Sequence, residues 1–406
     1  MSGLIVKHLD SLAELRRAAP AWDELWQRSE ITLPTARADL IALWCECFAA
    51  GQPFRATVVE ESGQLVAALP LVGRKLMGMK VGVLPGNHWS SAGDLLLDPH
   101  ADTERVCGAL LGALQERSPA WLWFDAVPAQ TNRWQTFLRA VEQRQLAYVR
   151  RRRFTIDLVR IGSDGKEYFD SRSRSQRRHV RRAASRAQRG GPTELRCHEC
   201  LTPQRVEELL TTCFEIEASG WKGQAQSAML HSPGACAFYL RQAHQLAAWG
   251  QLSLNLLWHQ ARPIAFEYGW QSKGVYGSAK VGYDETFAPL SPGQLLRYFL
   301  IEQFHSQSDV QWVDFLGPSS DATSKWATHE YPVERIALSQ GTARSLEGMV
   351  GRALFAAYRH GWPLVCGIRG AAARIAGRAA IAQHAPAPSL PDCGEVACDP
   401  AAVSQA

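Results

Sequence analysis

The stretch LSLNLLWHQARPIAFEYGWQSKGVYGSAKVGY, residues 252–283, decides the fold of this chain. Leu252, Leu254 and Leu256 recur at every second position, a spacing typical of a half-buried strand. Turn-forming residues at 260–263 and 272–274 separate three apolar runs, which predicts strands over 252–259, 264–270 and 275–282. Because the connections are so short, we expect an antiparallel meander.

A helix and one more strand follow the meander. The sequence SPGQLLRYFLIEQF, residues 291–304, places Leu295, Phe299 and Leu300 on one helical face. Ser291 is a favourable N-cap and Pro292 a favourable first helical residue. The run 310–316 predicts a strand that ends at Asp314-Phe315-Leu316-Gly317.

The start of this helix has the chemistry of an anion site. A helix N-terminus presents unpaired amides and the positive end of a dipole, and Gly293 would let a phosphate approach the backbone of Gln294 closely. Since Pro292 lacks an N–H, the remaining amides would have to bind the anion. The alternative is that Ser291-Pro292-Gly293 only begins the helix.

Five short segments occur in an order that resembles a known family: Arg262-Pro263, Gly282-Tyr283-Asp284, Ser291-Pro292-Gly293, Asp314-Phe315-Leu316-Gly317 and Lys325-Trp326. They resemble the GNAT-type acetyltransferase domain of the cellulose-biosynthesis (CelD-like) proteins. Those proteins are similar in turn to the FemAB-like aminoacyltransferases. The resemblance covers residues 150–340 well and the first 150 more loosely. One departure is that the glycine-rich pyrophosphate loop of ordinary GNAT enzymes is absent, and Ser291-Pro292-Gly293 stands in its place.

The resemblance implies an acyltransferase that uses acetyl-CoA or another acyl-CoA. The implied acceptor is an amine or hydroxyl of a sugar, a polysaccharide or a cell-envelope precursor. The residues expected in the site are Asp314, Lys325 and Tyr283 for catalysis, and Ser291, Gly293, Gln294, Arg177 and Arg181 for the acyl-CoA. Asp284 is a second candidate base, and Glu267 and Trp221-Lys222 are weaker candidates. Asp314 could instead cap the turn after its strand, and Lys325 could be a solvated lysine.

The most basic segment of the chain lies between residues 166 and 189. It holds nine basic residues against two acidic ones, a net charge of +7, whereas the whole chain carries +5. Val180, Ala183, Ala184 and Ala187 form a narrow apolar stripe, so we expect a helix that docks through this stripe and exposes its arginines. It is either a solvated helix between two halves or a surface that binds phosphates.

Two rival functions rest on that segment. The first is a FemAB-like aminoacyltransferase that takes aminoacyl-tRNA, whose phosphates the arginines would bind. The second is a non-catalytic module that binds a nucleotide or a nucleic acid.

A similar order of expected helices and strands in residues 1–158 and 203–340 predicts a two-lobed α/β protein. At 406 residues, with 46% apolar and 20% charged residues, the chain is long enough for two or three domains. The resemblance to the FemAB-like proteins implies that these are two tandem GNAT-like lobes, with mixed sheets flanked by helices. The predicted parts are a first lobe at 1–160, a basic helical connector at 161–200, a catalytic lobe at 201–345, a helical extension at 346–383 and a disordered tail at 384–406.

Several classes of site and location are not expected. The N-terminus lacks the pattern of a signal peptide, and no apolar run approaches the ~20 residues of a membrane span, so we expect a cytoplasmic protein. Ten cysteines show no pairing rhythm, and Cys197-His198-Glu199-Cys200 has no second pair at zinc-site spacing. We therefore expect no metal.

Overall fold

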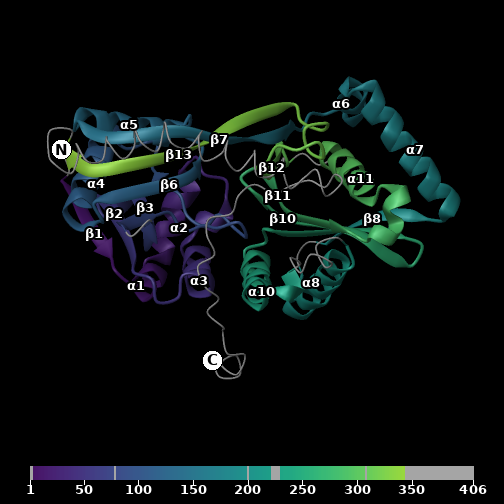
Figure 1. The fold of residues 1–406 in the computed structure, drawn as a ribbon, viewed down its shortest axis with the longest axis horizontal. Helices are drawn as coiled ribbons and strands as arrows, with labels where there is room; N and C mark the ends of the chain where they lie inside the picture. Colours follow the sequence, from purple (N-terminus) through teal and green to yellow (C-terminus); the bar gives the residue numbers. More distant parts are fainter. Residues whose placement is uncertain (1–2, 77–78, 199–200, 221–228, 307–308, 343–406) are drawn as a thin grey trace, which may run out of the picture. The chain divides into compact units, whose positions relative to one another are not determined.

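The computed structural model describes residues 3–76, 79–198, 201–220, 229–306 and 309–342 (Figure 1). The predicted extension at 346–383, the tail at 384–406, Trp221-Lys222 and Cys200 lie outside the described residues. No helix within the described ranges is long and apolar enough to cross a membrane. The structure is a mixed α/β fold in which helices flank one large mixed sheet of strand order β1-β2-β3-β4-β6-β13-β7-β12-β11-β10-β9-β8.

Internal contacts divide the chain into two compact units. Unit 1 comprises Met1–Ser29, Gly51–Arg152 and Glu334–Ala406, and unit 2 comprises Glu30–Ala50 and Arg153–Val333. The lobe boundary that we drew at residue 160 differs from this division in two ways. Helix α3 (Ala38–Phe48) belongs to unit 2, because Phe48 packs on Phe238 with ring centroids 4.9 Å apart. The expected connector at 161–200 is part of unit 2 as well.

In the described part of unit 1, two helices follow the first strand and two more lie between or after later strands. Its elements are β1 (Leu4–Leu9), α1 (Leu12–Arg17), α2 (Ala19–Arg28), β2 (Phe54–Glu61), β3 (Gln64–Leu76), β4 (Met79–Val83), β5 (Leu96–Leu97), α4 (Thr103–Arg117), β6 (Trp121–Val127) and α5 (Asn132–Gln143). The predicted hairpin is confirmed as β2 and β3. Two long strands, β7 (Leu146–Arg160) and β13 (His329–Thr342), contribute residues to both units. The core of unit 1 is formed largely by aromatic and aliphatic residues of α4, α5 and the sheet, with Trp134 and Phe137 fully buried.

Unit 2 carries the meander that the sequence predicts. Its further elements are η1 (Pro34–Ala36), α6 (Gly165–Ser171), α7 (Arg174–Gly190), β8 (Thr193–His198), α8 (Pro203–Ala218), η2 (Met229–His231), α10 (Pro233–Ala248), β9 (Leu252–His259), β10 (Arg262–Ser272), β11 (Val275–Tyr283), η3 (Glu285–Leu290), α11 (Pro292–Ser306) and β12 (Trp312–Pro318). Strands β9, β10 and β11 pair antiparallel in sequence order, which confirms the meander. The helix predicted at 291–304 is α11.

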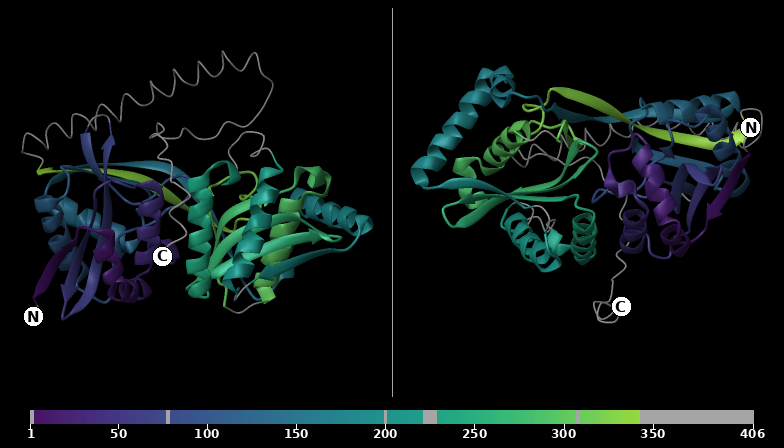
Figure 2. Two further views of the ribbon diagram at one scale, coloured as in Figure 1. Left: turned by 90° about the horizontal axis from the view of Figure 1, so that it is seen from below. Right: turned by 180° about the vertical axis from the view of Figure 1, so that it is seen from behind.

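The helices of unit 2 cover the two faces of its sheet. Helices α7 and α11 lie on one face, and α8 and α10 lie on the other (Figures 1 and 2). Side chains show the same division. Tyr268 of β10 donates its hydroxyl to Gln242 of α10 at 2.8 Å, whereas Val313 of β12 packs with Leu300 and Phe304 of α11.

The basic segment is two helices rather than one. Helix α6 ends at Ser171, the backbone is extended at Arg172, and α7 begins after Ser173, whose hydroxyl accepts the amide of Gln176 at 3.2 Å. The prediction of a continuous helix was therefore wrong, because this serine caps a new one. The predicted docking stripe is confirmed, since Val180, Ala183 and Ala187 are buried.

Candidate active site

Two neighbouring strands of unit 2 diverge part-way along their length. Strands β11 and β12 are parallel and pair over only three positions, from Val275 with Trp312 to Gly277 with Asp314. Strand β11 nevertheless continues to Tyr283, and β12 continues to Pro318. We call the opening that begins after Gly277 and Asp314 the split. The backbone amides of β11 that face the split have no neighbouring strand to accept their hydrogen bonds. Buried backbone amides need such an acceptor.

The geometry of β11 at the split is fixed by a β-bulge. The register between β10 and β11 shifts beyond Tyr268 and Gly269, which pair with Lys280 and Ser278, so Ala279 is left without a partner in β10. A Cβ at Gly269 would collide with the carbonyl oxygen of Gly277. Only glycine permits this approach, so the bulge is specified by the sequence.

Asp314 lies at the narrow end of the split. Asp314 pairs with Gly277 of β11, which in turn pairs with Trp270 of β10, so the three residues lie on the same face of the sheet. This is the face that α8 and α10 cover. The Asp314 carboxylate accepts the amide of Leu316 and the hydroxyl of Tyr331, each at 2.8 Å. Burial raises the pKa of Asp314 to about 6 despite these two hydrogen bonds. A carboxylate with such a pKa suits general-base catalysis near neutral pH.

The structure does not place the other predicted catalytic residues beside Asp314. Tyr283 is 37% exposed at the far end of β11, and Lys325 is exposed next to the buried Trp326. Asp284, the second candidate base, is held at 2.6 Å by Arg262 and also accepts the amide and hydroxyl of Thr286. Asp284 therefore caps η3, which explains the Arg262 and Asp284 motifs as a structural pair.

The start of α11 offers one backbone amide to an anion. Ser291 has a left-handed backbone, and its carbonyl accepts the amides of Gln294 and Leu295 at 3.0 and 3.1 Å. Because Pro292 has no N–H, Gly293 alone has a first-turn amide with no acceptor among the described residues. The side-chain oxygen of Gln294 accepts Gln176 and Trp326 at 3.0 and 3.1 Å. Gln294 thus joins α7 and the Trp326 loop to this turn.

This arrangement of strands and helix is matched by a known domain. Residues 174–325 match the family model described as an acetyltransferase (GNAT) domain. These residues are therefore similar to a GNAT acetyltransferase domain. The match begins at α7 and ends at Lys325, so it includes the split, Asp314 and the start of α11.

Solved structures resemble the chain well beyond residues 174–325. A conserved protein of unknown function from Bacteroides thetaiotaomicron has 13% identity and a TM-score of 0.52, over 82% of this chain and 100% of its own. FemX has 11% identity and a TM-score of 0.52, over 82% of this chain and 96% of its own. At these identities the likeness shows a shared fold. A search of curated proteins gave no significant match.

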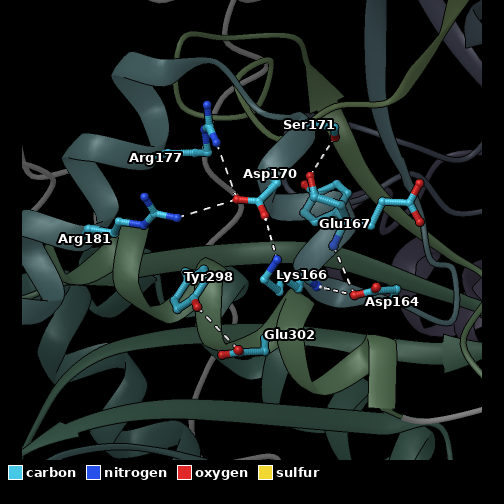
Figure 3. A network of polar contacts seen from close by, with 10 residues as sticks. Asp164, Lys166, Glu167, Asp170, Ser171, Arg177, Arg181, Tyr298 and Glu302 are labelled. Atoms are coloured by element: carbon cyan, nitrogen blue, oxygen red, sulfur yellow. Dashed lines mark hydrogen bonds and ion pairs between the residues drawn. The ribbon is translucent and has the colours of Figure 1, made fainter.

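The outer face of α7 is rich in arginine. Eight residues of this face line a hollow of about 780 Å³: Arg174, Arg177, Arg178, Arg181, Arg182, Ser185, Arg186 and Arg189. Asp170 of α6 lies between Lys166, Arg177 and Arg181, at 3.3, 3.4 and 3.6 Å (Figure 3). The hydrogen bond from Lys166, followed by the contact with Arg177, lowers the pKa of Asp170. The two arginines predicted to bind the acyl-CoA are thus partly neutralised.

Sequence reasoning missed two residues near the split, Arg297 and Tyr331. Arg297 of α11 is 7% exposed and pairs with Glu267 of β10 at 3.0 Å. A charged residue within the apolar face of α11 and another in the buried run 264–270 were the available signal. Tyr331 follows the matched motifs in the chain, and nothing in its local sequence indicates its contact with Asp314. The described residues contain no cluster of three metal-binding side chains.

Proposed function

We propose that the chain transfers an acyl group from acetyl-CoA or another acyl-CoA to an amine or hydroxyl. The observation that carries this proposal is the split beside Asp314, a buried carboxylate whose pKa is raised to about 6. The acceptor class, a sugar, polysaccharide or envelope precursor, rests on the resemblance to the cellulose-biosynthesis family.

The proposed reaction needs one base and one oxyanion donor. As the acceptor nitrogen or oxygen attacks the thioester carbon, Asp314 takes its proton, and a β11 amide facing the split stabilises the oxyanion. The C–S bond then breaks, and the CoA sulfur leaves as a thiol after taking up a proton. Since Asp314 faces α8 and α10, the acceptor approaches from that side, whereas the CoA enters past the start of α11.

The experiment that tests this proposal is the substitution Gly293→Asp. A Cβ at Gly293 would lie 3.7 Å from the ring of Tyr283, an ordinary contact, and an acidic residue in a first helical turn is favourable. We expect Tm to change by only a few degrees. Because the carboxylate would oppose the CoA pyrophosphate, the acetyl-CoA affinity should fall at least about tenfold, a loss of ~1.4 kcal/mol. Calorimetric titration with acetyl-CoA measures the affinity of the Gly293→Asp variant and of the unmodified protein.

The chain supplies a matched control for this variant. Helix α10 begins with the same tripeptide, Ser232-Pro233-Gly234, and a Cβ at Gly234 would meet no atom within 4 Å. Gly234→Asp should leave acetyl-CoA binding unchanged. Equal affinities in the Gly293→Asp and unmodified proteins would show that this turn binds no phosphate.

A second candidate function is aminoacyl transfer from aminoacyl-tRNA, and the arginine face of α7 is the observation that favours it. A ligand that binds only the native state raises Tm. Thermal shift with acetyl-CoA, with CoA and with bulk tRNA therefore separates the two functions. Stabilisation by tRNA alone would favour the second.

A further inference from the structure

We propose that Arg297 is a positioning residue that keeps β11 and β12 apart, so that the split remains open for the acyl donor. This inference rests on the proposed function and assigns a role to a side chain outside the predicted site. Arg297 lies one helical turn after Gly293, on the same side of α11.

Arg297 contacts both strands directly beyond their last pair. On β11, its guanidinium donates to the hydroxyl of Ser278 at 3.4 Å, and Ser278 is the residue after Gly277. On β12, the guanidinium lies 4.3 Å from the ring centroid of Phe315, the residue after Asp314. On the α11 face of the sheet, one planar group therefore contacts a side chain of each strand at the first position beyond their last pair.

Glu267 holds this guanidinium in place from the third strand. Its carboxylate accepts Arg297 at 3.0 Å, and its side chain is 1% exposed. Asn255 of β9 is the strand partner of Glu267 and lies on the same face of the sheet. Its side-chain amide donates to the hydroxyl of Tyr276 at 3.0 Å. A buried ion pair is weak support for stability, because its desolvation cost offsets the Coulomb attraction. A positioning role accounts for its retention next to the bulge.

The alternative is that the pair only fills the core beneath α11. The two roles differ in what happens when the pair is replaced by apolar residues. A buried ion pair can often be replaced by hydrophobic residues at little cost, whereas removal of one partner leaves an unpaired buried charge. We therefore choose the double variant Arg297→Leu/Glu267→Leu. A leucine side chain is shorter than that of arginine, so it fills the core without reaching the Ser278 hydroxyl or the Phe315 ring that Arg297 contacts.

We expect the double variant to stay folded, with Tm within about 5 °C of the unmodified protein, and to bind acetyl-CoA at least tenfold more weakly. Hydrogen exchange provides a readout that does not depend on the ligand. If β11 and β12 approach each other and pair in the double variant, the amides of 278–281 and 315–317 should exchange more slowly than in the unmodified protein. A core-filling role predicts unchanged affinity and unchanged or faster exchange.

A matched control comes from unit 1. Arg133 and Asp94 form another buried pair, at 2.6 Å, with side chains 7% and 10% exposed. Arg133→Leu/Asp94→Leu can lower Tm but should leave acetyl-CoA affinity unchanged. A second variant, Phe315→Leu, removes the ring that Arg297 stacks on without exposing a charge. It should weaken acetyl-CoA binding in the same direction, by about threefold or more, even if the double variant fails to fold.

The outcomes separate this inference from the proposed function. If the unmodified protein does not bind acetyl-CoA, the proposed function fails, and slower exchange in the double variant would still support the role of Arg297. Unchanged exchange at 278–281 and 315–317 in a folded double variant overturns the inference, whatever the affinity. If the double variant unfolds, unchanged acetyl-CoA affinity in Phe315→Leu overturns it.

Discussion

Replacement of Asp314 by asparagine is expected to lower the rate of acyl transfer by about 100-fold or more, the usual contribution of a general base. The amide keeps the shape of the carboxylate and can still accept one of the two hydrogen bonds from Leu316 and Tyr331. It cannot take a proton from the acceptor. Release of the CoA thiol from acetyl-CoA, measured with a panel of amino sugars and amines, gives the rate.

The pH profile should identify Asp314 as the base. Its pKa of about 6 means that it is mostly protonated below pH 6, so kcat/KM of the unmodified protein should fall as the pH drops through that value. The asparagine variant should lack this limb. A limb near pH 6 that persists in Asp314→Asn would assign the base to another group.

As the pH rises towards 6, the stability of the native state should fall whereas the activity rises. Because burial raises the pKa of Asp314 above its unfolded value, the native state binds the proton more tightly, and ionisation of this carboxyl costs stability as the pH rises from about 4 to 6. Above pH 6 the full cost is present, at most about 3 kcal/mol. We expect Asp314→Asn to raise Tm at pH 8 relative to the unmodified protein by more than it does at pH 4. Thermal unfolding at the two pH values measures this difference.

The local pattern of the sequence was enough to predict the centre of unit 2. The period-two leucines of β9, the turns at 260–263 and 272–274, and the Ser-Pro-Gly start of α11 are local signals, and each element formed where it was expected. Strand β12 begins two residues later than predicted, at Trp312. Periodicity indicates which residues pair and which face is buried, so it is most reliable in a meander whose partners are adjacent in sequence.

Contacts between distant segments could not be predicted in the same way. Helix α3 joins unit 2 through Phe48 and Phe238, which are far apart in the chain, and no local pattern indicates that choice. The break between α6 and α7 depends on one serine that caps a helix within a segment rich in arginine. At the site, the sequence suggested Asp314 as a base at a strand end, whereas Asp314 lies inside β12, and its pKa of about 6 depends on burial by the folded chain.

Removal of arginines from α7 is expected to decide whether this helix binds a nucleic acid. The outer face carries seven arginines and no acidic residue over a helix about 25 Å long. Each phosphate contact releases counterions, so RNA affinity should fall steeply with salt, with a slope of roughly 0.7 to 0.9 per contact. Replacing Arg177, Arg178, Arg181 and Arg182 by alanine should flatten this slope by about three and weaken binding about 100-fold at low salt. Fluorescence titration with bulk tRNA over a range of salt concentrations measures both quantities.

Two double variants, each with two of these four arginines replaced by alanine, provide a comparison on the same helix. Arg178 and Arg182 have no acidic partner among the described residues, whereas Arg177 and Arg181 share Asp170. Alanine favours helix, so each double variant should keep α7 intact. If RNA binds, the Arg178/Arg182 pair should lose more affinity than the Arg177/Arg181 pair, because the latter charges are already partly neutralised. No RNA binding by the unmodified protein at low salt would exclude both the tRNA-dependent and the nucleic-acid functions. A tenfold loss of acetyl-CoA affinity in the quadruple variant would instead assign the arginines to the phosphates of CoA, which the single amide of Gly293 cannot neutralise by itself.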